Sequence, residues 1–170
     1  MKKILFLSVS LALILAGCQQ TPKEPVVDLD AEKAAIGQLF DKFMQGIELR
    51  SVDTIVKYIN DDLLACGTDP SEFWNKKEMI DIWNQMLSNN LPVMKFMGDK
   101  VIKVAPDGNS AIAVDQFYTT FTPEIAWRNV YWLNKIDGKW MISFWSNALI
   151  PKNEDLSIIN DAVANKNDGE

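Results

Sequence analysis

The 170-residue chain contains no histidine. This absence excludes Ser-His-Asp and Cys-His catalysis, the common zinc sites that use histidine, and the usual general base at neutral pH. Basic residues are also in the minority, because 17 Lys and Arg stand against 23 Asp and Glu and give a formal net charge of −6. Since binding to phosphate backbones needs a basic patch, this balance argues against a nucleic-acid partner.

Glycine and proline are scarce, with 8 and 7 residues, and there are 2 cysteines. The low glycine and proline content excludes collagen-like and low-complexity chains, and the 48% hydrophobic content argues against disorder. Neither Asp61-Asp62 nor Asp28-x-Asp30 has the spacing of a calcium loop. The sequence therefore predicts one domain with an ordinary apolar core, no cofactor and no metal site.

The chain begins with Met1-Lys2-Lys3, and an apolar run follows from Ile4 to Ala16, interrupted by Ser8 and Ser10. As a helix this run would rise about 20 Å, which is too short for a bilayer core of about 30 Å. A charged start, a short apolar run and small residues after it are typical of a secretory signal peptide.

The run ends in Leu15-Ala16-Gly17-Cys18, which matches the bacterial lipobox. Residues 1–17 therefore resemble a lipoprotein signal peptide. In such proteins the lipobox cysteine, here Cys18, is acylated and becomes the mature N-terminus, so the lipid bilayer is an expected partner. An ordinary signal peptide that carries a cysteine is the alternative. Residues 19–25 are polar, with two prolines, and residues 18–29 are expected to form the lipidated N-terminus and a flexible tether.

The residue after the lipobox cysteine bears on localisation. Gln19 is not the aspartate that retains lipoproteins at the inner membrane of enteric-type bacteria. A bacterial cell-envelope location at the periplasmic face of the outer membrane is therefore favoured over the inner membrane.

If Cys18 is acylated, Cys66 has no partner for an intrachain disulfide, and its apolar neighbours predict an inert buried thiol.

The 30–150 segment is expected to form one domain, and 151–170 a polar tail. Apolar residues at steps of three and four predict a helix over 30–49, with Asp28 or Asp30 as its N-cap. Further helices are predicted from Ser51 to about Tyr58 and over 76–89, and strands over 61–66, 94–105, 110–121, 125–135 and 139–149. Phe73, Trp74 and Trp83 are interpreted as core or lid packing in preference to a binding cage.

Helices followed by an antiparallel sheet indicate an α+β fold. The order of elements resembles the nuclear transport factor 2-like cone. The loop from Gly67 to Trp74, the segment 76–80 behind it and the segment 137–142 are similar to the SnoaL-like branch. The resemblance covers about residues 31–150. It implies a cystatin-like cone of three N-terminal helices against a curved antiparallel sheet, with a pocket between them. Members of this superfamily often form a homodimer through the sheet, so the resemblance also makes such a dimer an expected partner.

The register of the last hairpin determines which side chains face that pocket. A two-residue turn at Asp137-Gly138 would pair Trp140 with Lys135. A three-residue loop with a glycine bulge would pair Trp140 with Asn134, and this second register is preferred because it gathers apolar side chains on one face. The polar residues on the inner face, and so the predicted ligand-binding residues, are then Gln116, Tyr118, Arg128 and Ser146. The opposite face carries Trp127, Asn129, Tyr131, Trp145 and Asn147, and is expected to be a subunit interface.

The favoured function is a lipid-anchored envelope protein whose SnoaL-like domain binds a small, mostly apolar molecule without catalysis. One alternative is a pocket enzyme of the isomerase or dehydratase type, with Asp115 or Asp69 as base and Tyr118 as donor. SnoaL-like relatives often place a histidine in the final strand, where this chain has Ser146 and Asn147, so the resemblance does not carry that chemistry over. A second alternative is a protein-interaction module of the envelope. Fold alone does not decide among them.

Overall fold

The computed structural model describes residues 27–89 and 91–167. The predicted signal peptide and Cys18 lie outside these residues. Helix α2 (Leu29–Glu48) begins where the Asp28 side chain accepts hydrogen bonds from the backbone N–H groups of Asp30 and Ala31, at 3.1 and 3.0 Å. This carboxylate satisfies two donors that have no partner within the helix, which confirms Asp28 as the N-cap. Among the described helices, none is long and apolar enough to cross a membrane.

Two shorter helical segments follow the same rules of capping. Ser51 accepts a hydrogen bond from the Thr54 N–H and starts α3 (Val52–Ile55), which continues as the 3-10 helix η1 (Val56–Tyr58). Helix α4 (Lys76–Ser88) starts with a reciprocal capping box between Asn75 and Glu78. The predicted helices over 30–49 and 76–89 therefore agree with the structure to within one residue.

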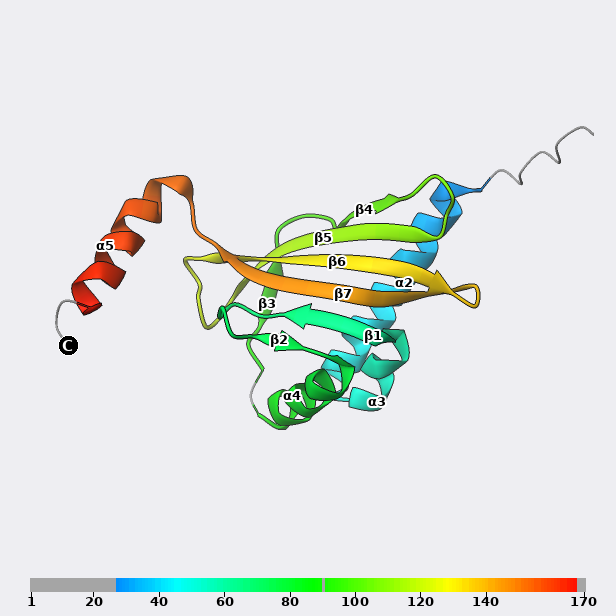
Figure 1. Cartoon of the computed structure of the whole chain (residues 1–170), viewed down its shortest axis with the longest axis horizontal. Coiled ribbons are helices and arrows are strands. Elements are labelled where there is room, and N and C mark those ends of the chain that lie inside the picture. The colour runs from blue at the N-terminus through cyan, green and yellow to red at the C-terminus, as the bar shows by residue number, and fades with distance from the viewer. Residues whose placement is uncertain (1–26, 90, 168–170) are drawn as a thin grey trace, which may run out of the picture.

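Seven strands form one curved sheet in the order β2-β1-β7-β6-β5-β3, and β4 also pairs with β5 (Figure 1). The strands are β1 (Ile59–Cys66), β2 (Phe73–Trp74), β3 (Met94–Phe96), β4 (Val101–Val104), β5 (Ser110–Thr119), β6 (Ala126–Ile136) and β7 (Lys139–Ile150). Every pairing is antiparallel except β1 with β7, which is parallel. The fold is thus α+β as predicted, but its sheet is mixed. The single strand predicted over 94–105 is two strands, β3 and β4.

The last hairpin has the two-residue turn, so the preferred register was wrong. Asp137 and Gly138 both have positive φ, 50° and 75°, which is the backbone of a tight primed turn, and Lys135 pairs with Trp140. A bulge does exist, but it lies further along β7. There Leu133 pairs with Ile142 and Trp132 with Phe144, so Ser143 is the extra residue.

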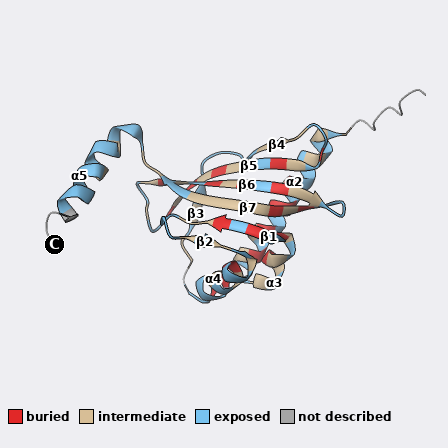
Figure 2. Ribbon diagram, viewed as in Figure 1, coloured by how far each residue is buried: buried red, intermediate tan, exposed pale blue. Residues whose placement is uncertain are grey.

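The hairpin register and this bulge together determine which side chains of β6 and β7 face the helices. Tyr131 and Leu133 of β6 are buried against the helices, whereas Trp132 between them is 53% exposed on the outer face. Trp140 faces inward before the bulge, and Trp145 packs against the core after it. On β5, on β6 and on β7 after the bulge, the face predicted to be internal is therefore the outer face, and the face predicted to be a subunit interface lines the interior. Figure 2 shows buried residues interspersed with residues of intermediate and exposed class along β5 and β6.

Aromatic side chains join α2 and α4 to the inner face of the sheet. The Phe40 ring lies 4.8 Å from that of Tyr131, and Phe43 contacts the rings of Trp83 and Trp145 at 6.0 and 6.2 Å. Each of these side chains removes a large apolar area from water, and tilted or edge-on pairs add a further stabilising term. The helices are thus held against the concave side of the sheet, where the candidate site lies.

After β7 the chain continues through the 3-10 helix η2 (Asn153–Asp155) into α5 (Leu156–Asn167). Figure 1 shows α5 projecting away from the sheet. The sequence predicts only a polar tail over 151–170, so this helix was not anticipated.

Candidate functional site

Two adjoining cavities lie between the inner face of the sheet and the helices. Their volumes are about 360 and about 190 Å³. The residues that line both cavities are Trp83, Met86, Trp127, Trp145 and Asn147. The two cavities therefore adjoin along the inner face of the sheet, and the shared tryptophan side chains lie between them.

The larger cavity is almost entirely apolar. The second half of α2 supplies Phe43, Met44 and Ile47, and the other walls come from α4, the loop after it and strands β3 and β5–β7. The described polar side chains that line it, apart from the phenol of Tyr131, are Thr119, Asn129 and Asn147. A large apolar wall with a few placed polar groups is the usual composition of a small-molecule site. Its remaining apolar lining residues are Trp83, Met86, Leu87, Leu91, Pro92, Met94, Phe96, Phe117, Phe121, Trp127 and Trp145.

A hydrogen-bond network fixes the amide at the floor of this cavity. Asn129 Nδ2 donates to Asp115 Oδ1 at 2.9 Å, and Asn129 Oδ1 accepts from Trp145 Nε1 and Asn147 Nδ2 at 3.0 and 3.1 Å. The orientation of the Asn129 amide is thereby determined, since exchanging its oxygen and nitrogen would break all three bonds. The network also orients Asn147, whose side chain reaches both cavities.

Asp115 lies behind this network and is paired with a lysine. Its carboxylate is 5% exposed and forms an ion pair with Lys100, whose ammonium lies 4.1 Å from the centre of the Phe40 ring. Burial lowers the pKa of Lys100 to about 8. Asp115 is not among the residues that line either cavity. Its two oxygens are engaged by Lys100 and Asn129, which is the arrangement of a structural ion pair.

The other predicted base, Asp69, lies in the exposed turn before β2. Its Oδ1 accepts from the Ser71 N–H at 2.9 Å and from the Ser71 hydroxyl at 2.5 Å. These bonds hold the pKa of Asp69 below its usual value. Tyr118, the predicted donor, is on the outer face of β5, so the structure does not bring it together with Asp115.

The four predicted ligand-binding residues also lie on the outer face, and their assignment to the internal pocket is corrected. Gln116 and Arg128 are cross-strand partners, and with the Gln116 amide oxygen oriented toward the guanidinium it accepts from Arg128 Nε and Nη2 at 2.9 and 2.7 Å. Tyr118 lies further along β5, and Ser146 pairs with Val130. The site residues on the other face of β5 and β6 were missed because the preferred register of the last hairpin was wrong by one residue, and those on β7 also because the bulge at Ser143 reverses the side chains after it. The aromatic and amide residues that alternate from 127 to 131 were the available signal.

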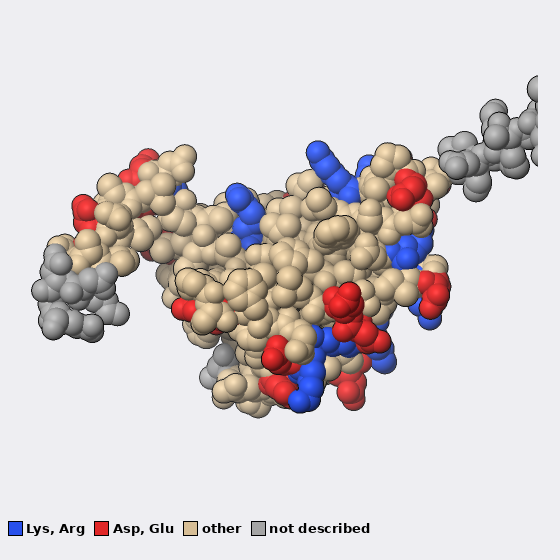
Figure 3. Space-filling model, in the orientation of Figure 1, with Lys and Arg blue, Asp and Glu red and all other residues tan. Residues whose placement is uncertain are grey.

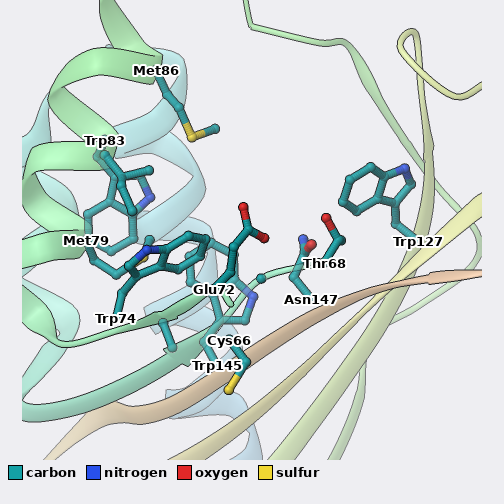
Figure 4. Close-up of a pocket in the computed structure, with 13 residues that line it drawn as sticks. Cys66, Thr68, Glu72, Trp74, Met79, Trp83, Met86, Trp127, Trp145 and Asn147 are labelled. Carbon is teal, nitrogen blue, oxygen red and sulfur yellow. The ribbon is translucent and has the colours of Figure 1, made fainter. Parts of the chain in front are cut away.

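The smaller cavity lies between α4, β7 and the loop that joins β1 to β2 (Figure 4). Trp74, which sequence reasoning placed in a core or lid, forms part of its wall. Trp83 is indeed a core residue, at 3% exposed, while one part of its ring still borders the cavity. Cys66 is a free thiol here; it is half-buried and lines the cavity, so it is more accessible than predicted.

Comparison with known families gives a match over most of the domain. Residues 36–148 match the model of the SnoaL-like domain. No curated protein matches the chain.

Among solved structures, a nuclear transport factor 2-like protein of unknown function from Pseudomonas putida is 18% identical. The match covers 76% of this chain and 93% of that one, with a TM-score of 0.61. A domain of unknown function with a cystatin-like fold from Nostoc punctiforme is 12% identical, covering 77% and 85%, with a TM-score of 0.63. A nuclear transport factor 2-like protein of unknown function from Shewanella baltica is 15% identical, covering 75% and 100%, with a TM-score of 0.55. At these identities the likeness shows the fold alone.

Proposed function

The chain belongs to the SnoaL-like domain family, and we propose that its domain binds a small, mostly apolar molecule without catalysing a reaction. The observation that carries the proposal is the larger cavity of about 360 Å³. Its walls are aromatic, aliphatic and methionine side chains, and amides fixed by hydrogen bonds stand at its floor. Such a site gains affinity from apolar burial and orientation from a few polar contacts.

The chemistry of the lining argues against catalysis. General acid–base catalysis needs a side chain that can exchange a proton near neutral pH and reaches the substrate. Among the described residues around the larger cavity, the titratable one is Tyr131, and burial raises its pKa well above the usual value. Asp115, the candidate base predicted on β5, is held by Lys100 and Asn129 and does not line the cavity.

The proposed location is the bacterial envelope, with the chain anchored through acylated Cys18 at the periplasmic face of the outer membrane. The lipobox sequence at residues 15–18 supports this proposal. The anchor would precede α2, whereas the larger cavity lies beside the C-terminal half of that helix. The lining residues Phe43 to Ile47 follow Leu29 by 14 to 18 residues, so along the helix the cavity would lie about 21–27 Å from the point where the tether joins the domain.

A homodimer through the sheet is proposed as well. The outer face exposes large apolar side chains, with Ile112 at 54% and Trp132 at 53%. Figure 3 shows this face as largely uncharged over β5–β7. Burial of such a patch against a second copy would remove apolar surface from water.

The ligand site can be tested with 1-aminoanthracene, a neutral aromatic probe whose fluorescence rises in apolar surroundings. Wild-type protein should bind it with saturation. Met44→Trp, which adds bulk to the wall of the larger cavity, should weaken binding about tenfold or more, since overpacking a site costs about 1–3 kcal/mol. Met97→Trp is the matched control, because Met97 is 45% exposed and lines neither cavity. Equal binding by wild-type and Met44→Trp would refute the site.

The anchor has its own test. Cells that express the full chain and are fed labelled palmitate should label the wild-type protein but not Cys18→Ser. Labelling of both would show that the acyl chain is attached elsewhere, and labelling of neither would refute the anchor.

A further inference from the structure

The smaller cavity has tryptophan side chains on opposite sides. Trp83 and Trp145 stack on one another with ring centres 6.0 Å apart and form one wall. Figure 4 shows Trp74 beside this pair and Trp127 across the opening. Trp127 is held by a hydrogen bond from its Nε1 to Thr122 Oγ1 at 2.6 Å. The site is thus built from large, rigid rings whose electron-rich faces attract positive charge.

A single carboxylate reaches into this space from the loop between β1 and β2. Glu72 is the acidic residue among those that line the cavity, and Figure 4 shows its carboxylate directed between Trp83 and Trp127. Its Oε2 accepts from the Asp69 N–H at 2.9 Å, and its backbone N–H donates to the Asp69 carbonyl at 3.0 Å. The carboxylate is therefore positioned before any ligand arrives.

Gly67 allows the loop to close in this way. A Cβ atom at this position would lie 2.1 Å from Glu72 Oε2 and 2.6 Å from Cη2 of Trp74. Both distances are far shorter than a van der Waals contact, so any larger residue would push the carboxylate and the indole ring away. Because residue 67 has no side chain, the Glu72 carboxylate and the Trp74 ring can lie close together in the wall of the cavity.

The charge of Glu72 has no basic partner among the described side chains. Within residues 27–89 and 91–165, no Lys or Arg forms an ion pair with Glu72. Lys76, four residues along the chain, is engaged by Asp61 at 2.7 Å. The cavity therefore offers a negative charge beside aromatic walls.

These features select an organic cation over a metal ion. A hard metal ion needs several oxygen ligands, and the described residues contain no group of three or more candidate ligands. A quaternary ammonium group has a diffuse charge and an apolar surface, which suit aromatic rings and methionine. We infer that the smaller cavity binds an organic cation of the quaternary ammonium type. Its volume of about 190 Å³ equals about six water volumes, enough for a group such as choline. This inference does not depend on occupancy of the larger cavity.

The experiment is a titration of the full chain with choline, followed by intrinsic tryptophan fluorescence and by calorimetry at constant ionic strength. Choline should bind with saturation, and its uncharged isostere 3,3-dimethylbutan-1-ol should bind at least about tenfold more weakly. Glu72→Gln keeps an oxygen for the Asp69 N–H but removes the charge, and should weaken choline about fivefold. Trp74→Leu should weaken it about twofold to thirtyfold.

Matched substitutions elsewhere serve as controls. Glu154→Gln and Trp132→Leu make the same chemical changes at exposed positions outside the cavity and should leave choline binding unchanged. Two results would overturn the inference: no choline binding by wild type, or equal binding of choline and its isostere. If choline fails while 1-aminoanthracene binds, this inference falls and the proposed function stands; the reverse pattern refutes the proposed function alone.

Discussion

Replacing Asp115 by asparagine should destabilise the domain, because it leaves the ammonium of Lys100 without its anion. Asp115 is 5% exposed, and the Lys100 side chain is 21% exposed. Removing one partner of a buried ion pair typically costs about 3–5 kcal/mol. Because Lys100 is partly exposed and can lose its proton, we expect the lower end, about 3 kcal/mol, or a fall in Tm of roughly 6–12 °C for a domain of this size.

A double-mutant cycle separates the ion pair from its surroundings. Asp115→Asn keeps an oxygen that can accept from Asn129 Nδ2, so the cavity network is preserved. Lys100→Met alone should also cost about 3 kcal/mol, since it leaves the carboxylate buried and unpaired. The double variant removes both charges and should be more stable than the sum of the single effects by about 2 kcal/mol or more.

The measurement is urea unfolding at pH 7, followed by far-ultraviolet circular dichroism. Stability of the single variants within about 0.5 kcal/mol of wild type, or strictly additive effects, would refute the structural role assigned to this pair. Asp115 would then be available for the chemistry that the enzyme alternative requires.

Three further substitutions test other parts of the structure. Hydrogen bonds from Lys135 and Trp140 lower the pKa of Glu32, so its stabilising effect is present above a pH of about 4.5 and is lost as the pH falls below it. The free energy of unfolding of Glu32→Gln, measured with urea, should therefore fall less than that of wild type between about pH 5 and pH 3. An equal fall in the two proteins would contradict this. Phe43→Ala should lower the free energy of unfolding by about 3–5 kcal/mol, and a loss under 1 kcal/mol by the same assay would show that the aromatic core is wrongly described. Trp132→Arg should convert the proposed dimer to monomer in light scattering after size exclusion, and an unchanged mass would exclude the outer face as the interface.

The helices of the fold are well predicted from the sequence because their signals are local. Asp28 and Ser51 begin helices as expected, since a side-chain acceptor beside the first turn acts within four residues. The position of the last hairpin turn, at Asp137-Gly138, was predicted for the same reason, although its preferred length was wrong. The family resemblance also gave the cone-like architecture, which the match over residues 36–148 confirms.

The site was predicted less well because it depends on strand register. The extra residue at Ser143 reverses the orientation of every later side chain of β7, and no local pattern marks it. The preferred three-residue hairpin loop also shifted β6 by one residue relative to β7, so the pocket was assigned to the wrong face of β5 and β6, and the predicted residues Gln116 and Arg128 lie outside. Helix α5 was missed because the chain after Pro151 has a weak apolar pattern. Trp74 was understood as packing because one sequence cannot show that its ring borders a cavity beside Glu72.

Native mass spectrometry of residues 20–170, purified from a bacterial periplasm, would test most directly whether the domain is a receptor for small molecules. We predict a non-covalent mass that leaves on gentle activation and is absent from Met44→Trp. A clean dimer that keeps its apo mass after incubation with a mixture of apolar metabolites would contradict the account and favour a protein-interaction module.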